Sequence, residues 1–307
     1  MEIRHTCSGA QKFNTVGLPG DYRHSPGMEA GERRDIDADW GQKVYRGKKE
    51  DGSPWEKVFP WFGYKLHLVV DATYEIPVGF SVTKASAGEV KEAHRLLEEM
   101  AKKSPEAMKK CRYFLGDRGY DDGKLITKLW ADYGIKPLID IRNLWRDREE
   151  NRLVSGQKNV VYNYKGQVYC HCQKTDKRPA MAYGGFEKDR GTLKYRCPAR
   201  HYGTKCAGIE ECRVKSGVRI PLKEDRRIFT PLVRSSYRWK SLYKKRTAVE
   251  RVNSRLDRAF GFEQHYIRGL EKMQTRCTLA LIVMLVMALG RVKEKDRKNL
   301  RSLVKAA

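Results

Sequence analysis

The sequence predicts an α/β protein built on a mixed sheet with helices on its faces, and three observations support this. Two neighbouring segments, 63–71 and 77–82, alternate between apolar and polar residues with the period of two that is typical of strands. Two helical patterns follow, and each is next to a short apolar run that has the length of a buried strand. Strands that alternate with helices favour a sheet covered by helices.

The first two strands are predicted to form a hairpin through a turn at 71–75. Lys65 and His67 lie on the opposite face from the apolar residues of the first strand. The apolar positions of the two strands are Tyr64, Leu66, Leu68 and Val70, then Val78, Phe80 and Val82.

Each of the two predicted helices has one apolar stripe. Residues 89–103 carry Val90, Ala93, Leu96, Leu97 and Met100, and the helix that starts near Asp122 and ends at Gly134 carries Leu125, Ile126, Leu129, Trp130 and Tyr133. The short strands 112–115 and 135–141 flank the second helix, and Asp117 follows the first of them. Sheets of this kind bind ligands at the carboxyl ends of strands, so Asp117 is a candidate site residue.

We predict four parts along the chain. Residues 1–34 show no period and are expected to be irregular; residues 35–142 and 236–292 form the core; residues 143–235 form a β-rich, Cys-rich insertion; residues 293–307 form a basic tail. The apolar run 277–290 is shorter than the roughly 20 residues that span a bilayer. We expect it to be a buried helix capped by Gly290, in a cytoplasmic, nucleoid-associated protein without a membrane partner.

The charge balance predicts a polyanionic partner. Lys and Arg total 63 against 38 Asp and Glu, which gives a net charge of +25. Apolar residues make up 40% of the chain, so it is expected to fold rather than to act as a disordered basic tail. Nucleic acid is the simplest partner for such a protein. The alternative is a protein whose surface is merely basic.

Five of the eight cysteines are concentrated in the predicted insertion. In a cytosolic protein, such a cluster favours a metal over disulfides. We expect a structural Zn²⁺ that compensates for a small apolar core, with His171 and His201 as alternative ligands. The spacing contains no CxxC pair, and a reduced, metal-free insertion is the alternative. The predicted ligands are Cys170, Cys172, Cys197, Cys206 and Cys212.

A second acidic feature lies on the helical segment 243–250. Tyr243, Arg246 and Glu250 fall on one face of an ideal helix. This spacing fits a carboxylate ligand held by a neighbouring arginine, and it equally fits an ordinary surface ion pair.

These motifs, in this order, resemble bacterial insertion-sequence DDE transposases of the IS4/IS5 type. Asp117, Arg118, Gly119 and Tyr120 match the block of the second aspartate, and Tyr243, Arg246 and Glu250 match the Tyr-x2-Arg-x3-Glu pattern. The resemblance implies an RNase H-like core with a mixed five-stranded sheet. It also implies metal-dependent cleavage and strand transfer of double-stranded DNA by a homodimer, at terminal inverted repeats and at the target.

The resemblance implies that three carboxylates hold two Mg²⁺ or Mn²⁺ ions. Asp117 and Glu250 match two of them. No apolar strand that ends in aspartate precedes Gly63, and Asp37 is the candidate for the first carboxylate. The alternative is a chain that lacks its N-terminal part and with it that residue.

Five arginines and one tyrosine near these acids are predicted to contact DNA. They are Arg118, Tyr243, Arg246, Arg251, Arg255 and Arg258; a solvated helix face is the alternative for the last three. Asp257 stands where the family has a basic residue. Two other functions stay open. One is a truncated or domesticated DNA-binding protein without activity, and the other is an RNase H-fold nuclease that joins nothing.

Overall fold

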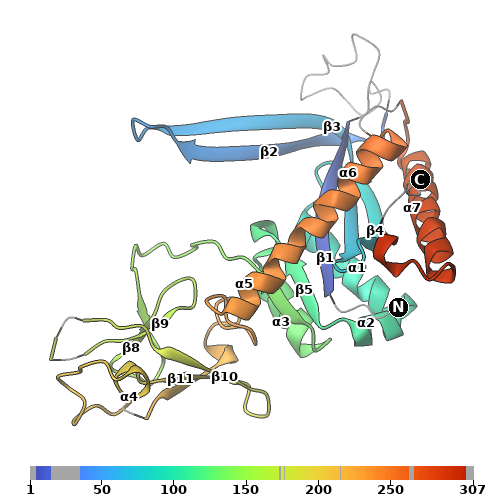
Figure 1. The fold of residues 1–307 in the computed structure, drawn as a ribbon. Coiled ribbons are helices and arrows are strands. Elements are labelled where there is room, and N and C mark those ends of the chain that lie inside the picture. Colours follow the sequence, from blue (N-terminus) through green and yellow to red (C-terminus); the bar gives the residue numbers. More distant parts are fainter. Residues whose placement is uncertain are drawn as a thin grey trace. The chain divides into compact units, whose positions relative to one another are not determined.

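The computed structural model describes residues 5–14, 35–172, 174–175, 177–214, 216–262 and 266–301, with the backbone alone for 5–14. The chain is a mixed α/β protein, as predicted, and it divides into two compact units (Figure 1). The first unit consists of Met1–Cys111 and Arg246–Ala307, and the second of Arg112–Lys245.

The first unit is built around the long strand β3, Pro54–Asp71. Its inner half pairs antiparallel with β1, His5–Asn14, on one side and with β4, Ile76–Lys84, on the other. The β3–β4 hairpin is therefore confirmed, and the side chains of Tyr64, Leu66, Leu68 and Val70 are buried as expected. Within the segment 1–34 that we expected to be irregular, residues 5–14 form β1, and the other residues lie outside the described ranges.

The outer half of β3 pairs only with β2, Asp39–Lys48, among the described strands, and the two form a ribbon. Figure 1 shows that this ribbon extends away from the helices of the first unit. The sequence analysis did not predict it. Apolar and charged residues occur on both faces of the ribbon. The alternation of apolar and polar residues that indicates a half-buried strand is therefore absent.

Four helices belong to the described part of the first unit. They are α1 (Glu89–Lys103), α2 (Pro105–Lys110), α6 (Ala248–Phe260) and α7 (Leu270–Lys293). Helices α1 and α7 contact β4 and β3, and α6 contacts β1 and β3. The predicted apolar stripe of α1 is buried at four of its five positions, Ala93, Leu96, Leu97 and Met100. A short 3₁₀ turn, Arg297–Asn299, follows α7.

Helix α7 differs from the prediction for 277–290. It runs three residues past Gly290 and is capped by Glu294, so Gly290 is not its C-cap. One face packs on the sheet, but Leu279, Ile282, Val286 and Leu289 on the other face are exposed. In the described part of the chain, α7 is the one helix whose length and composition would allow it to cross a membrane, and 33% of its apolar window is buried.

The second unit begins with a parallel pair of strands, β5 (Tyr113–Gly116) and β6 (Lys136–Ile139). The helix α3 (Gly123–Ala131) connects them, and this strand–helix–strand order is the predicted one. A 3₁₀ turn, Arg118–Tyr120, stands between β5 and α3. Helix α5 (Tyr237–Tyr243) contacts β6 and leads into a 3₁₀ turn at Lys244–Thr247.

Two small antiparallel sheets fill the rest of the second unit. The first contains β7 (Arg152–Leu153), β8 (Val160–Tyr162) and β9 (Val168–Cys170), and the second contains β10 (Ala182–Glu187), β11 (Thr192–Arg196) and β12 (Val218–Pro221). Helix α4 (Pro198–Tyr202) and a 3₁₀ turn at Leu222–Glu224 complete it.

The expectation that this region lacks an apolar core was wrong. Its sheets share a cluster of buried side chains that includes Val160, Leu193, Ile220 and Phe229. The apolar residues are spread singly over strands of two to six residues, which is too short for a period to be visible in the sequence.

Candidate active site

Asp117 directly follows β5 and caps the 3₁₀ turn 118–120. Its Oδ1 accepts a hydrogen bond from the N–H of Gly119 at 2.7 Å, and its side chain is exposed. All four residues of β5 are buried, so the strand fixes the place at which the carboxylate emerges. Gly116 matters because a Cβ there would lie 3.1 Å from the Cβ of Tyr120, which is buried beneath the turn.

A second carboxylate, Asp140, lies at the same edge of the parallel pair. Gly116 is opposite Ile139 in the register, so Asp117 and Asp140 follow neighbouring strand ends. Arg118 Nε donates to Asp140 Oδ2 at 2.5 Å, and this hydrogen bond raises the pKa of Arg118. Asp140 was not predicted as a site residue, because the predicted strand 135–141 contained it. The strand β6 ends at Ile139, so Asp140 directly follows it as Asp117 follows β5.

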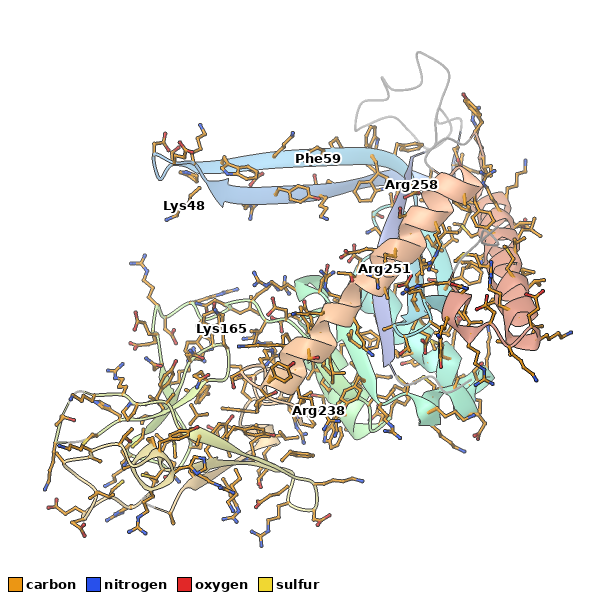
Figure 2. The ribbon with its side chains drawn as sticks, in the orientation of Figure 1. Lys48, Phe59, Lys165, Arg238, Arg251 and Arg258 are labelled. Carbon is orange, nitrogen blue, oxygen red and sulfur yellow. The ribbon has the colours of Figure 1, made fainter. Side chains whose placement is uncertain are left out.

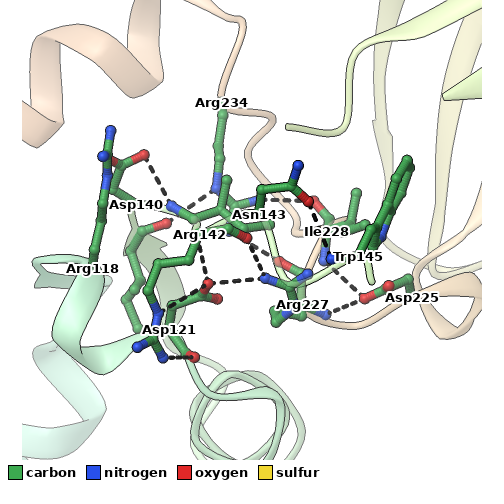
Figure 3. Close-up of polar contacts among 12 residues, drawn as sticks. Arg118, Asp121, Asp140, Arg142, Asn143, Trp145, Asp225, Arg227, Ile228 and Arg234 are labelled. Atoms are coloured by element: carbon green, nitrogen blue, oxygen red, sulfur yellow. Dashed lines mark hydrogen bonds and ion pairs between the residues drawn. The ribbon is translucent and has the colours of Figure 1, made fainter. Parts of the chain in front are cut away.

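Behind this edge, Asp121 forms a buried ionic cluster (Figure 3). Its Oδ2 accepts from Arg227 Nη1 at 2.9 Å and from the backbone N–H of Arg142 at 2.7 Å. The next residue, Asp122, caps α3 by accepting from the N–H of Leu125, whereas the buried Asp121 is paired with Arg227.

Arg234 also contacts this region. Its guanidinium donates to the backbone carbonyls of Ile139, Ile228 and Arg227, and burial lowers its pKa to about 10. The contact with Ile139 connects the end of β6 to the segment that precedes α5, and the other two contacts lie within that segment.

Glu250 lies in the first turn of α6 and is exposed. Arg246 Nη1 donates to its Oε1 at 2.6 Å, so the predicted contact between these two side chains is confirmed. Val249 and Val252 are buried and fix the face that α6 turns to the sheet. A carboxylate in the first turn also interacts favourably with the helix dipole.

Arg251 and Arg255 of α6 both bind Glu75, which ends the turn between β3 and β4 and is buried. Arg251 Nε lies 2.6 Å from Glu75 Oε1, and Arg255 Nη1 lies 2.9 Å from Oε2. Arg255 also donates to the backbone carbonyl of Glu75 at 2.9 Å, and burial lowers its pKa. Both predicted DNA contacts therefore have an internal partner, whereas Arg258 is exposed one turn further along α6 (Figure 2).

The acidic tract that contains Asp37 lies at the N-terminus of α7. Asp37 Oδ2 accepts from the N–H of Leu270 at 3.2 Å, and the buried Asp35 accepts from the N–H of Gly269 and the hydroxyl of Tyr64. Burial, followed by this hydrogen bond, raises the pKa of Tyr64. These acids thus satisfy donors that the start of a helix leaves unpaired, a role that the polar sequence context did not reveal.

Tyr243 stacks on Trp239 within the second unit. Their ring centroids are 4.5 Å apart, and Trp239 is buried. Arg238 donates to the hydroxyl of Tyr113 at 2.8 Å. The ring of Tyr243 is thus engaged in packing.

The five clustered cysteines are free thiols that line one cavity of 730 Å³ in the second unit. Burial, followed by the four neighbouring thiols, raises the pKa of Cys170 to about 12. The sequence thus brings five distant cysteines together. Among the residues that the structure describes, however, no three His, Cys, Asp or Glu side chains are arranged to hold a metal ion, either here or elsewhere.

A family model described as the transposase DDE domain matches residues 39–286. The chain belongs to this family. The match includes Asp117 and Glu250, and it confirms the resemblance that the two motifs indicated. No curated protein and no solved structure matches the chain. The protein is therefore a transposase, an enzyme that acts on DNA, and DDE transposases generally use divalent metal ions such as Mg²⁺ or Mn²⁺.

Proposed function

We propose that this transposase is of the IS4-like type, and that an RNase H-like core cleaves DNA at the ends of an insertion sequence and joins them to a target. The observation that carries the proposal is Asp117, held at the carboxyl edge of β5 beside the parallel strand β6. Three antiparallel strands of the first unit and two parallel strands of the second supply the elements of the implied sheet.

In this proposal, Asp117 and Glu250 hold the divalent ions, and their carboxylate oxygens are the ligands that Mg²⁺ prefers. Divalent ions held by these carboxylates would supply activation of a water or a 3′-hydroxyl and charge stabilisation of the leaving oxygen. Arg246 orients Glu250 through the 2.6 Å hydrogen bond, and Arg118 neutralises Asp140. Arg258 contacts a phosphate, whereas Arg251 and Arg255 support α6 through Glu75 and Tyr243 packs on Trp239.

The test replaces the two acids with their amides in the full chain and offers terminal-repeat DNA with Mg²⁺ or Mn²⁺. We expect Asp117→Asn and Glu250→Gln to abolish cleavage while DNA binding remains. Asp132→Asn and Glu106→Gln remove exposed acids from the same two units and are expected to cleave like the wild type. Cleavage by both active-site variants would overturn the proposal. Cutting without joining by the wild type would identify a nuclease, and binding without cutting an inactive DNA-binding protein.

Asp37 is our candidate for the third carboxylate, and its amide variant separates two roles. The substitution Asp37→Asn would keep an oxygen that can accept from Leu270 N–H but would remove the charge that a metal ion needs. If Asp37 is a ligand, this variant loses cleavage at unchanged thermal stability. Retained cleavage would leave Asp37 with its role at the start of α7 alone.

We also propose that the thiol cavity of the second unit binds a structural Zn²⁺ through four of its five cysteines, which requires the thiols to rotate toward a common centre. The convergence of Cys170, Cys172, Cys197, Cys206 and Cys212 supports this. Because the unit has its own apolar core, removal of zinc is expected to loosen the cavity loops without unfolding the unit. Metal analysis of the purified protein should find one equivalent of zinc, and well under one equivalent would exclude the site.

Finally, we propose that the protein acts on the nucleoid, in the cytoplasm. We also propose that it binds DNA as a homodimer and that the two copies contact each other through the outer face of α7. Exposed Leu279, Ile282, Val286 and Leu289 lie along this face, with Glu271 at one end and Lys293 at the other. An antiparallel second copy would therefore pair the apolar residues and place each Glu271 near the partner's Lys293.

Sedimentation of the full chain with DNA tests this surface. Ile282→Ser with Val286→Ser should give a monomer where the wild type gives a dimer, and Glu271→Lys with Lys293→Glu should restore the charge pattern in reverse and keep the dimer. A wild-type monomer on DNA, or a face that binds lipid vesicles instead, would contradict the proposal.

A further inference from the structure

The ribbon of β2 and β3, residues 40–62, has two unlike faces. Residues directly opposite each other in the register share a face, and so do residues two apart along a strand. Lys43 pairs with Phe59, Tyr45 with Lys57, and Gly47 with Trp55. We call this side the lysine–aromatic face and define it as Lys43, Tyr45, Trp55, Lys57 and Phe59.

The rings and cations of the lysine–aromatic face contact one another and remain open to solvent. The centroids of Tyr45 and Phe59 are 5.4 Å apart, with an interplanar angle of 88°. Lys43 Nζ lies 4.9 Å from the Tyr45 centroid, and Lys57 Nζ lies 4.7 Å from that of Phe59. The exposed fractions of Tyr45, Trp55 and Phe59 are 43%, 39% and 44%. Gly47 lets the Trp55 ring lie across the neighbouring strand, because a Cβ there would approach that ring to 2.5 Å.

The charges of the ribbon differ between its faces. The one acid on the same side of the ribbon is Asp39 at the start of β2, and it accepts hydrogen bonds from Ser86. The opposite face carries Trp40, Val44, Val58 and Lys48, and its Arg46 is paired with Glu56 at 2.6 Å. On the lysine–aromatic face, by contrast, both ammonium groups lie over exposed aromatic rings.

A ribbon of this kind is unfavourable as a free structure. Two strands alone are only marginally stable, and large exposed apolar side chains on unpaired strands promote aggregation. Figure 2 shows Lys48 and Phe59 on the ribbon, away from the labelled arginines of α6 in the first unit. A partner that takes up flat rings and positive charge together would offset this cost. Nucleic acid with unpaired bases has both properties, because bases stack on aromatic rings and phosphates attract ammonium groups.

We infer that the lysine–aromatic face binds a DNA strand whose bases are unpaired. Tyr45, Phe59 and Trp55 stack on bases, and Lys43 and Lys57 contact the phosphates. Unpaired bases fit better than the duplex groove, because the face has no Arg, Asn or Gln to read base edges. This inference deepens the proposed function and rests on its DNA partner.

Fluorescence anisotropy with the full chain tests the inference. The probes are a blunt duplex and the same duplex with a single-stranded extension of about ten nucleotides, which suits the site size of stacking proteins. The wild type should bind the extended probe more tightly. Tyr45→Ala with Phe59→Ala should remove this preference, a loss of about tenfold or more, and should leave binding of the blunt duplex unchanged.

The opposite face provides the matched control. Val44 and Val58 are 37% and 45% exposed, much like the two rings, so Val44→Ala with Val58→Ala perturbs the same ribbon to a similar extent. This control should keep the preference for the extended probe. In addition, Lys43→Gln with Lys57→Gln should reduce the salt slope on the extended probe by about 1.4, since each phosphate contact on a single strand contributes about 0.7.

The outcomes separate the inference from the function on which it rests. A ring variant that keeps the preference, or a control that loses as much, would overturn the inference and leave the transposase intact. A ring variant that changes the oligomeric state instead of DNA binding would assign the face to a second copy. If the wild type binds neither probe, the proposed DNA-processing function itself fails.

Discussion

At the scale of single residues, the protonation of His67 makes the stability of the first unit depend on pH. It is buried on β3 with its Nε2 2.9 Å from Thr83 Oγ1, and burial lowers its pKa to about 4, against the opposing effect of Glu92. Lys65 and Arg95 lower the pKa further. The unfolded state, with an ordinary histidine pKa of about 6.5, binds the proton more tightly. The stability contributed by neutral His67 is therefore complete above about pH 6.5 and is lost as the pH falls toward 4.

We predict that the free energy of unfolding falls by about 2.5 kcal/mol more in the wild type than in His67→Gln between pH 7 and pH 4.5. Urea unfolding at the two pH values measures this difference. His201→Gln replaces an exposed histidine of the second unit and should behave like the wild type. Equal acid sensitivity of the wild type and His67→Gln would show that His67 is not held neutral.

At the scale of elements, the position of α6 depends on Glu75 in the turn between β3 and β4. This buried carboxylate binds Arg251 and Arg255, and it also lies 3.4 Å from Arg301. Removal of one partner from a buried ion pair leaves an uncompensated charge, which costs about 3–5 kcal/mol. We therefore predict that Glu75→Gln lowers the free energy of unfolding by about 3 kcal/mol and reduces cleavage, because α6 carries Glu250.

Chemical denaturation and cleavage assays at a temperature where the variant stays folded measure the two effects. Glu106→Gln, which changes an exposed acid in the first turn of α2, should change neither. A variant with lost stability and full cleavage would show that Glu75 does not position α6 for catalysis.

The elements also show what the sequence could predict and where it fell short. The helices α1 and α3 and the strands β3 and β4 were predicted because apolar residues recur along them with the period of the element. On β3, however, Lys65 and His67 on the other face are buried as well. The ribbon was missed because both its faces mix aromatic and charged residues. The placement of Asp117 followed from an apolar run that stops at Gly116, whereas the partnership of Glu75 with Arg251 spans 176 positions and leaves no local pattern.

At the scale of the whole molecule, a net charge of +25 predicts DNA affinity that falls steeply with salt. Arg255 and Arg258 lie within one turn on α6, yet the structure separates their roles, because Arg255 is bound to Glu75 and Arg258 is exposed.

We predict that Arg258→Gln reduces the slope of log affinity against log salt by about 0.9 on duplex DNA and leaves stability unchanged. Arg255→Gln should lower stability at a nearly unchanged slope. Binding titrations between 50 and 200 mM salt, roughly the range over which such slopes are resolved, measure both. A slope that changes for Arg255→Gln and not for Arg258→Gln would assign the phosphate contact to the other arginine and would mean that Glu75 releases Arg255 when DNA binds.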